Sequence, residues 1–315
     1  MRYANLGHSG LKVSRVSIGA WLTYGASVEA KDSRPILRHA IESGINMIDT
    51  ADIYARGEAE RVIAPVLKDF PRHHLVLATK CFWPMSDDPN DRGLSRKHII
   101  ESIEGSLKRL EQDYVDIMYC HRFDETTPLE ETIQAMGDVI RQGKALYWGT
   151  SCWTSEQLND AHQLSRELGV PRPIVEQPCY NLLERSIEPQ ILPTARELGM
   201  GIAPWSPLAG GILTGKYNNG RPAGSRGAES QWLDRMLVAD NIERVQKFCS
   251  LAAEAGHAPE ALALAWLLHQ SGVNTVITGA TRTEHIDKNL VAADLELDSD
   301  LLARISNIFS AGVPS

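Results

Sequence analysis

Short apolar runs alternate with longer amphipathic segments along most of this sequence. Eight runs are short and mostly apolar, which is typical of buried strands: residues 16–19, 47–49, 75–80, 115–120, 145–149, 174–177, 201–204 and 276–278. The intervening segments repeat apolar residues at helical spacing. Ser95, for example, is a candidate N-cap for a helix that carries Ile99, Ile103 and Leu107 on one face. Further helices are predicted over residues 30–43, 58–67, 129–141, 155–168, 187–198, 257–270, 283–292 and 299–309.

About eight strand–helix units in a chain of 315 residues predict one α/β domain, a (β/α)8 TIM barrel that spans residues 1–315. Residues 2–16 add an N-terminal β-hairpin with its turn at residues 7–10, and extra helices remain at the C-terminal end. A doubly wound sheet is the alternative, but no G-x-G-x-x-G motif follows the first predicted strand. The one long irregular segment, residues 208–230, is rich in Gly, Asn and Pro, which is typical of a functional or mobile loop.

Polar side chains stand at the carboxyl end of most apolar runs. Asp49, Lys80 and His121 end or follow three consecutive runs, and later runs lead to further polar tips: Ser151, Gln177 and the pair Trp205 and Ser206. The active sites of (β/α)8 barrels lie at this end, and neighbouring strands are about 4.8 Å apart. We therefore expect Asp49, Lys80 and His121 to share one mouth, with Tyr54 reaching over from a loop. Taken singly, each residue has an ordinary structural explanation, such as a helix cap, an ion pair or a buried hydrogen bond.

These residue types suit acid catalysis. A lysine ammonium about 4 Å from a tyrosine hydroxyl would favour the phenolate by roughly 4 kcal/mol at an effective dielectric constant of about 20. That would bring the tyrosine pKa from about 10 down to about 7. Asp49 would keep Lys80 charged and in place, and His121 would hydrogen-bond a carbonyl oxygen or the phenol. The pattern predicts a general acid, Tyr54, that protonates an oxyanion.

With these four residues and their surrounding segments, the sequence resembles the aldo-keto reductases over nearly its whole length. It is most similar to the branch of potassium-channel β subunits and their bacterial relatives, through residues 5–7 (NLG), 93–100 (GLSRKHII), 147–151 (YWGTS) and 205–208 (WSPL). The resemblance implies that Tyr54 is the proton donor, that Lys80 and Asp49 lower its pKa, and that His121 orients the substrate carbonyl. The channel subunits carry Asn where this chain has His121, which favours a working reductase over a mainly regulatory subunit.

The resemblance also implies NADPH or NADP+ bound in an extended pose across the mouth. Ser151 and Gln177 would bind the carboxamide, and Trp205 would stack on the nicotinamide. Lys216 and Arg226 would hold the 2′-phosphate, since two cations suit a phosphomonoester. The backbone of residues 206–210 would wrap the pyrophosphate, and Thr281 would add a phosphate contact. The full set of expected cofactor contacts is Trp21, Asp49, Ser151, Cys152, Gln177, Trp205, Ser206, Pro207, Leu208, Gly210, Lys216, Arg226, Gly279, Thr281, His285 and Asn289.

This sequence departs from its relatives at three of the cofactor-side positions. Cys152 stands where relatives often carry Arg or Asn, and His285 and Lys288 stand where the channel subunits carry Gln and Glu near the adenine. Residues 210–216 also fit most of a P-loop, but Tyr217 follows where that motif requires Ser or Thr.

The composition indicates which cellular compartment and which classes of partner to expect. A net charge of −8 argues against nucleic acid and anionic membranes as partners. The five cysteines form no C-x-x-C pair and predict free thiols in a reducing compartment, and no metal-ligand spacing is present. The first residues lack the apolar core of a signal peptide, and the longest strongly apolar stretch, residues 261–268, is far short of the roughly 18 residues of a membrane span. We expect a cytoplasmic protein without membrane insertion. A homo-oligomer stays open, because relatives are often tetrameric or larger.

The leading hypothesis is the reversible, NADPH-dependent reduction of aldehyde or ketone carbonyls to alcohols, with a small-molecule carbonyl or alcohol as substrate. An NADP(H)-binding regulatory or scaffold subunit with little turnover is the alternative. A third hypothesis is a phosphate-binding isomerase or aldolase in which Lys80 forms a Schiff base. The sequence does not name the substrate, although six aromatic residues near the predicted mouth suggest a partly apolar wall: Trp21, Tyr24, Phe82, Trp83, Trp153 and Trp232.

Overall fold

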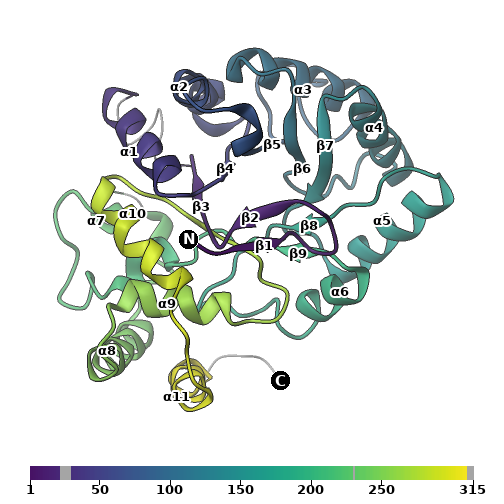
Figure 1. Ribbon diagram of the computed structural model, residues 1–315. Coiled ribbons are helices and arrows are strands. Elements are labelled where there is room, and N and C mark those ends of the chain that lie inside the picture. Colours follow the sequence, from purple (N-terminus) through teal and green to yellow (C-terminus); the bar gives the residue numbers. More distant parts are fainter. Residues whose placement is uncertain (22–29, 230, 311–315) are drawn as a thin grey trace.

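Eight parallel strands form one curved sheet with helices around its outer face (Figure 1). The structure is a computed structural model that describes residues 1–21, 30–229 and 231–310. The sheet order is β10-β3-β4-β5-β6-β7-β8-β9. Parallel bridges also join Ile202 to Val273 and Trp205 to Ile277, between segments that belong to the two edges of the sheet. The arrangement is consistent with the predicted (β/α)8 fold.

The strands of the sheet are short, and each lies where an apolar run predicts it: β3 (Val16–Gly19), β4 (Met47–Asp49), β5 (Val76–Cys81), β6 (Val115–Cys120), β7 (Ala145–Thr150), β8 (Val175–Glu176), β9 (Gly201–Ile202) and β10 (Val276–Thr278). The longer helices are α1 (Ala30–Glu42), α2 (Glu58–Leu67), α3 (Arg96–Leu110), α4 (Leu129–Arg141), α5 (Ser155–Glu167), α6 (Ile191–Leu198), α8 (Ala239–Glu254), α9 (Pro259–Leu268), α10 (Thr283–Leu290) and α11 (Ser299–Phe309).

Side chains alternate between two cores along each strand. On β6, Ile117 and Tyr119 belong to a cluster inside the curved sheet, whereas Met118 and Cys120 belong to the larger core between the sheet and the helices. All six residues of β6 are buried, because both faces of the strand are covered. This alternation decides which side chains at the strand ends point inward.

The predicted N-terminal hairpin is present as β1 (Tyr3–Asn5) and β2 (Lys12–Ser14), and it crosses the N-terminal end of the sheet (Figure 1). Leu6 and Val13 contribute to the inner cluster. Gly7 has φ +57°, and a Cβ atom there would lie 2.5 Å from the carbonyl oxygen of Gly199. The hairpin therefore seals the end of the sheet opposite to the strand tips that carry the candidate site.

The largest error of the sequence-based prediction lies in the C-terminal third. Helix α8 was not predicted, although Val245, Phe248 and Leu251 are buried at helical spacing. It packs against α11, where the Phe248 and Phe309 ring centroids lie 5.8 Å apart. The segment expected as an irregular loop also contains the short helix α7 (Arg226–Glu229) and the 3-10 turn η3 (Ala209–Thr214).

Within the described part of the chain, no helix is long and apolar enough to cross a membrane. Tyr24, one of the aromatic residues expected near the mouth, lies outside the described residues.

Candidate active site

Alternation along the strands turns Asp49, Lys80 and His121 to the inside of the curved sheet. The residue two positions before each of them belongs to the inner cluster: Met47, Ala78 and Tyr119. Lys80 is the next inward-facing residue after Ala78 on β5, and His121 directly follows β6. The structure thus brings these three side chains to one mouth, as the sequence predicts.

The Lys80 ammonium is the centre of this group. It is fully buried and has a partner for each of its three donors: Asp49 Oδ2 at 2.6 Å, the Thr50 carbonyl oxygen at 2.8 Å and Tyr54 Oη at 3.0 Å. Burial lowers the pKa of Lys80, but Asp49 and Tyr54 outweigh burial and raise it above its ordinary value. Lys80 is therefore held as a cation beside the tyrosine hydroxyl.

Asp49 also bonds a residue from the far side of the sheet. Its second oxygen, Oδ1, accepts a hydrogen bond of 2.8 Å from Gln177 Nε2, and Gln177 follows β8. The Ser151 hydroxyl in turn donates to the Gln177 carbonyl oxygen at 2.8 Å. One buried chain of hydrogen bonds thus links the expected carboxamide-binding residues to Lys80 and Tyr54.

Tyr54 begins a strained 3-10 turn, η1 (Tyr54–Gly57). Ala55, Arg56 and Gly57 all have positive φ, of 49°, 52° and 88°. Such a turn persists only where its surroundings hold it. A Cβ atom on Gly57 would lie 2.6 Å from the Arg109 side chain, which shows how closely that side chain covers the turn.

Two buried carboxylates, Asp52 and Glu60, lie close to this turn, and neither was predicted as a site residue from the sequence. Arg109 donates to Glu60 at 2.6 Å, and the Ser102 hydroxyl donates to Asp52 at 2.8 Å. Burial raises the pKa of Asp52 to about 7, and its Oδ1 atom has no hydrogen-bond partner among the described residues. The signal that could have found Asp52 is its position between Asp49 and Tyr54.

The predicted fall in the pKa of Tyr54 is wrong for this structure. Burial raises the pKa above the ordinary value of 10.0; Lys80 acts in the opposite direction but does not overcome burial. Asp49, expected to help lower the pKa, raises it through its own negative charge. Loss of water around the buried phenol is the largest influence on this pKa, and it depends on packing that the sequence does not show. Tyr54 is therefore protonated at neutral pH.

His121 lies against the tyrosine, with ring centroids 5.8 Å apart and an edge-to-face geometry. Burial, Lys80 and Arg122 lower the pKa of His121 well below its ordinary value, so the imidazole is neutral at pH 7. Its Nδ1 atom is buried and has no hydrogen-bond partner among the described residues. A neutral imidazole beside a protonated phenol can hydrogen-bond an uncharged carbonyl oxygen.

Aromatic rings cover the neighbouring part of the mouth. Trp205, which bridges to Cys179 and Ile277, meets Trp21 edge-to-face with ring centroids 6.0 Å apart. Trp21 meets Trp232 in the same manner at 5.4 Å. The three tryptophans thus lie together, and Trp232 comes from the 3-10 turn η4 (Gln231–Leu233), just after the segment predicted as the long irregular loop.

The segment expected to wrap the pyrophosphate forms a tight turn. Ser206, Ala209, Gly210 and Gly211 have positive φ, of 55°, 50°, 65° and 94°. Successive turns of this kind form concavities that bind anions. Pro207 is buried and Leu208 half-buried beside them. A Cβ atom on Gly210 would lie 2.6 Å from the Leu233 side chain, so this backbone passes directly beneath the returning chain.

The cations expected at the 2′-phosphate have few partners. The Lys216 ammonium lies 5.0 Å from the Tyr217 ring centroid, and the Arg226 guanidinium lies 5.9 Å from the Trp232 ring centroid. Neither pairs with a carboxylate of the described residues. Burial lowers the pKa of Arg226. A half-buried Arg226 and an exposed Lys216, neither with an acidic partner among the described residues, suit a bound phosphate.

His285, which is expected near the adenine, contacts Thr281, which is expected to contact a phosphate. Thr281 contacts its Nδ1 atom through both the backbone nitrogen and the hydroxyl, each at 3.4 Å. Burial first, then Arg282, Lys216 and Lys288, lower the pKa of His285. Lys216 therefore lies close enough to the start of α10 to influence His285, and the phosphate contacts expected of Lys216 and Thr281 stay predictions.

The other expected cofactor contacts differ in exposure. Gly279 and Thr281 are exposed between β10 and α10, and Asn289 is buried on α10. Cys152 is exposed after β7 with φ +58°, beside the buried Ser151. No direct contact joins Asn289 or Gly279 to the residues around Tyr54 in the described part of the chain, so their expected roles stay predictions.

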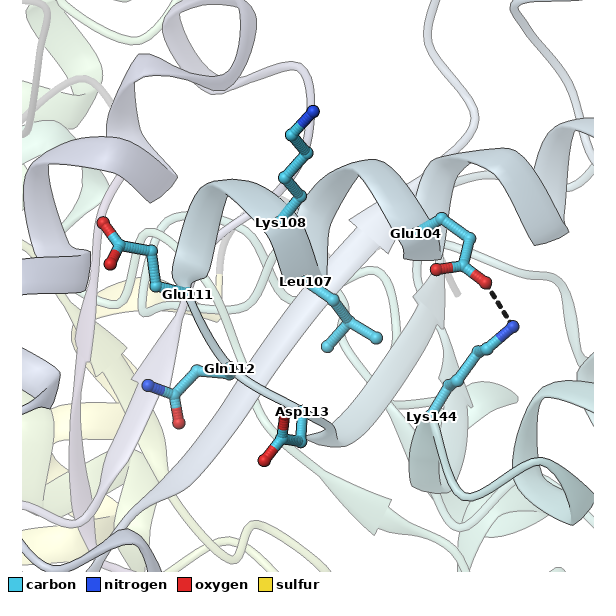
Figure 2. A pocket seen from close by; sticks show the side chains of 7 residues that line it. All are labelled: Glu104, Leu107, Lys108, Glu111, Gln112, Asp113 and Lys144. Carbon is cyan, nitrogen blue, oxygen red and sulfur yellow. Dashed lines mark hydrogen bonds and ion pairs between the residues drawn. The ribbon is translucent and has the colours of Figure 1, made fainter.

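A surface hollow at the N-terminal end of the sheet is not a second candidate active site. It lies between the end of α3 and the start of β7, and Figure 2 shows Glu104 and Lys144 forming an ion pair across it while Lys108 points away. Its charged side chains face solvent. The described residues also contain no group of three or more His, Cys, Asp or Glu side chains that could hold a metal ion.

Comparison with known proteins agrees with this geometry. Residues 15–309 match the model of the "Aldo/keto reductase family". Two curated relatives, both named "Probable voltage-gated potassium channel subunit beta", come from Oryza sativa subsp. japonica and Arabidopsis thaliana. Each is 45% identical over 302 residues, covering 94% of this chain and 92% of the relative. The chain therefore belongs to the aldo/keto reductase family.

Proposed function

We propose that this protein is an NADPH-dependent reductase of aldehyde or ketone carbonyls that works reversibly, with Tyr54 as the proton donor. The observation that carries the proposal is the buried hydrogen bond of 3.0 Å between Lys80 Nζ and Tyr54 Oη, with Asp49 at 2.6 Å behind it. Membership of the aldo/keto reductase family supports it, since family members generally bind NAD(P)H.

In the proposed reaction, the substrate oxygen lies between Tyr54 Oη and the His121 imidazole. His121 orients the carbonyl without adding charge, because its lowered pKa keeps it neutral. As negative charge develops on that oxygen, the Tyr54 hydroxyl donates its proton. Lys80 stabilises the phenolate that remains, and Asp49 keeps Lys80 in position. A raised Tyr54 pKa is compatible with this role, because an alkoxide is a stronger base than a phenolate.

The residues around the mouth fit the cofactor that this reaction requires. When bound, NADPH supplies the hydride. Ser151 and Gln177 would hold its carboxamide, Trp205 would cover the nicotinamide, and Lys216 with Arg226 would bind the 2′-phosphate. Lys216 and Arg226 have no carboxylate partner among the described residues, which supports a preference for the phosphorylated cofactor. A single barrel domain over residues 1–315 and a cytoplasmic location belong to the same proposal.

The test is NADPH oxidation by purified protein with a panel of aldehydes, ketones and sugars. We expect Tyr54→Phe to lower kcat by about 10²- to 10⁴-fold, the range for loss of a general acid, while NADPH binding persists. Tyr3→Phe is the matched control, because the exposed Tyr3 hydroxyl bonds only the Gly44 carbonyl oxygen. Full activity in Tyr54→Phe would remove the proton-donor assignment.

A regulatory or scaffold subunit is the second candidate, and the names of the two plant relatives favour it. Such a protein would retain NADP(H) but turn over none of the panel, and it would co-purify with a membrane channel. Rapid turnover by the isolated protein would count against this reading.

A Schiff-base role for Lys80 has little support. A nucleophilic amine needs a lowered pKa, whereas the pKa of Lys80 is raised and its three donors are occupied. Borohydride trapping of a substrate on Lys80 would reverse this judgement.

A further inference from the structure

Arg122 is a half-buried cation at the same mouth that the proposed mechanism does not use. It directly follows His121 at the tip of β6. Its Nη1 atom donates to the His121 carbonyl oxygen at 2.5 Å and reaches the Ser151 hydroxyl at 3.4 Å. Both contacts place the guanidinium between the tips of β6 and β7, beside the catalytic histidine.

The guanidinium has no carboxylate partner among the described residues. An arginine offers five N–H donors, and among the described residues Nη1 is the atom of Arg122 that donates hydrogen bonds. The carboxylate of Asp124, two positions along the chain, is bonded to the Leu94 backbone N–H and to the hydroxyls of Thr126 and Thr127. Glu176 is fully buried and accepts from the Thr150 hydroxyl. The acids near Arg122 are thus engaged elsewhere, and Nε and Nη2 remain available.

A row of rings leads from Arg122 to the candidate proton donor. The guanidinium carbon lies 5.6 Å from the Trp83 ring centroid, and Trp83 meets His121 edge-to-face at 6.3 Å. His121 meets Tyr54 at 5.8 Å. Trp83 is also 37% exposed and packs edge-to-face on Phe82 at 5.1 Å. The cation therefore stands at the far end of an aromatic wall that starts at Tyr54.

We propose that Arg122, held between the Trp83 ring and the His121 carbonyl oxygen, is an anion-binding subsite, and that the protein selects carbonyl compounds carrying a carboxylate or phosphate group. This inference rests on the proposed function, because it names the substrate class of that reaction. An arginine fork binds either anion bidentately. Contact with Trp83 restricts the side chain, so less conformational entropy is lost when an anion binds.

The charge of the whole protein favours a local cation for binding an anionic substrate. The net charge of −8 repels anions at long range, and the buried ion pair of Asp49 with Lys80 adds no net positive charge at the mouth. Lys80 is fully engaged, so it cannot bind the remote anionic group. Arg122 is the cation near His121 whose donors remain available to a ligand.

The kinetic test compares 4-carboxybenzaldehyde with its neutral methyl ester, because the two differ at the anionic group. We expect Arg122→Gln to lower kcat/KM for the acid relative to the ester by about 10- to 100-fold, the range for losing a hydrogen bond to a charged group. Arg122→Lys keeps the charge without the fork and should recover part of this ratio. An unchanged ratio in Arg122→Gln would overturn the subsite.

The matched control is Lys108→Gln, which removes the same charge at the opposite end of the sheet, where the exposed Lys108 points into solvent (Figure 2). It should leave the ratio at the wild-type value. A fall equal to that of Arg122→Gln would mean that net charge, rather than a subsite, sets the preference. A second pair, 4-formylphenyl phosphate and 4-methoxybenzaldehyde, distinguishes phosphate from carboxylate: the anion with the larger Arg122-dependent ratio identifies the class.

A binding measurement separates failure of the subsite from failure of the proposed function. Calorimetry with the NADP+-loaded protein would compare 4-carboxybenzyl alcohol with 4-(hydroxymethyl)benzamide. Tighter binding of the acid that Arg122→Gln abolishes supports the subsite even if no aldehyde is reduced. Reduction of neutral aldehydes together with equal binding of the two alcohols would uphold the reductase and overturn the subsite.

Discussion

The two ends of the candidate site are built in opposite ways. At the tyrosine end, the ammonium of Lys80 lies on a strand, is fully buried and has all three donors occupied. At the phosphate end, Lys216 and Arg226 lie in the segment between β9 and α8, and neither cation pairs with a carboxylate of the described residues; each lies near an aromatic ring instead. The Lys80 ammonium thus has all its hydrogen bonds without a ligand, whereas Lys216 and Arg226 are charges that a phosphate group could pair with.

This difference suits two separate tasks: proton transfer at the tyrosine end and cofactor binding at the phosphate end. Proton transfer needs groups held in place before the reaction, and strands in a closely packed sheet supply that rigidity. Binding of a long cofactor requires a segment that can close around it, and turns and short helices allow such movement. The comparison predicts that substitutions at the tyrosine end change stability and chemistry, while those at the phosphate end change affinity alone.

The largest expected effect on stability comes from Lys80→Met. Removal of the ammonium leaves the buried Asp49 carboxylate without its ion-pair partner, and breaking a buried pair in this way costs about 3–5 kcal/mol. Urea unfolding would measure the loss. The double variant Asp49→Asn with Lys80→Met should recover part of it, because no buried charge is then unpaired. Unchanged stability in the single variant would mean that water reaches Asp49. The tyrosine end would then not differ from the phosphate end in its effect on stability.

The next effect is a pH dependence from Asp52, also at the tyrosine end. Burial raises its folded-state pKa to about 7 from an ordinary 3.8, so the folded protein binds this proton more tightly than the unfolded chain. The resulting stability is complete below the unfolded-state pKa and is lost as pH rises through about 7. From about pH 4.5 to pH 7, the free energy of unfolding should fall by about 3 kcal/mol relative to Asp52→Asn.

The measurement is urea unfolding of both proteins across this range. Asn is a suitable replacement because its side-chain oxygen can still accept from the Ser102 hydroxyl. A constant difference between Asp52→Asn and wild type at every pH would show that Asp52 does not titrate in this window.

The smallest effect is expected at the phosphate end. Arg226→Gln should weaken NADPH binding by about 10- to 100-fold, as for loss of a charge-assisted hydrogen bond, and leave NADH binding unchanged. Thermal stability without cofactor should hardly change. Arg221→Gln is the control, since Arg221 lies in the same segment but pairs with Asp234 at 2.6 Å. Equal losses for both cofactors would refute a 2′-phosphate role for Arg226.

Much of the fold was predictable because the apolar runs are short and regularly spaced. The predicted bounds of β3, β6, α2 and α4 agree with the structure at both ends. Helix α8 was not predicted, although Val245, Phe248 and Leu251 recur at helical spacing. At the site, the grouping of Asp49, Tyr54, Lys80 and His121 was predictable because strand tips meet at one mouth.

The sequence by itself determined which side chains point inward, because the two-residue period of each strand carries Asp49, Lys80 and His121 to the same side as the inner core. Only the tertiary structure decided the burial, the pKa values and the hydrogen-bond partners of the side chains at the site. Burial, which depends on the packing of the whole chain, raises the pKa of Tyr54 against the pull of Lys80. The partners of Gln177 and Arg122 were likewise decided by distant strands and loops, since hydrogen-bond geometry between separate segments cannot be read from spacing along one of them.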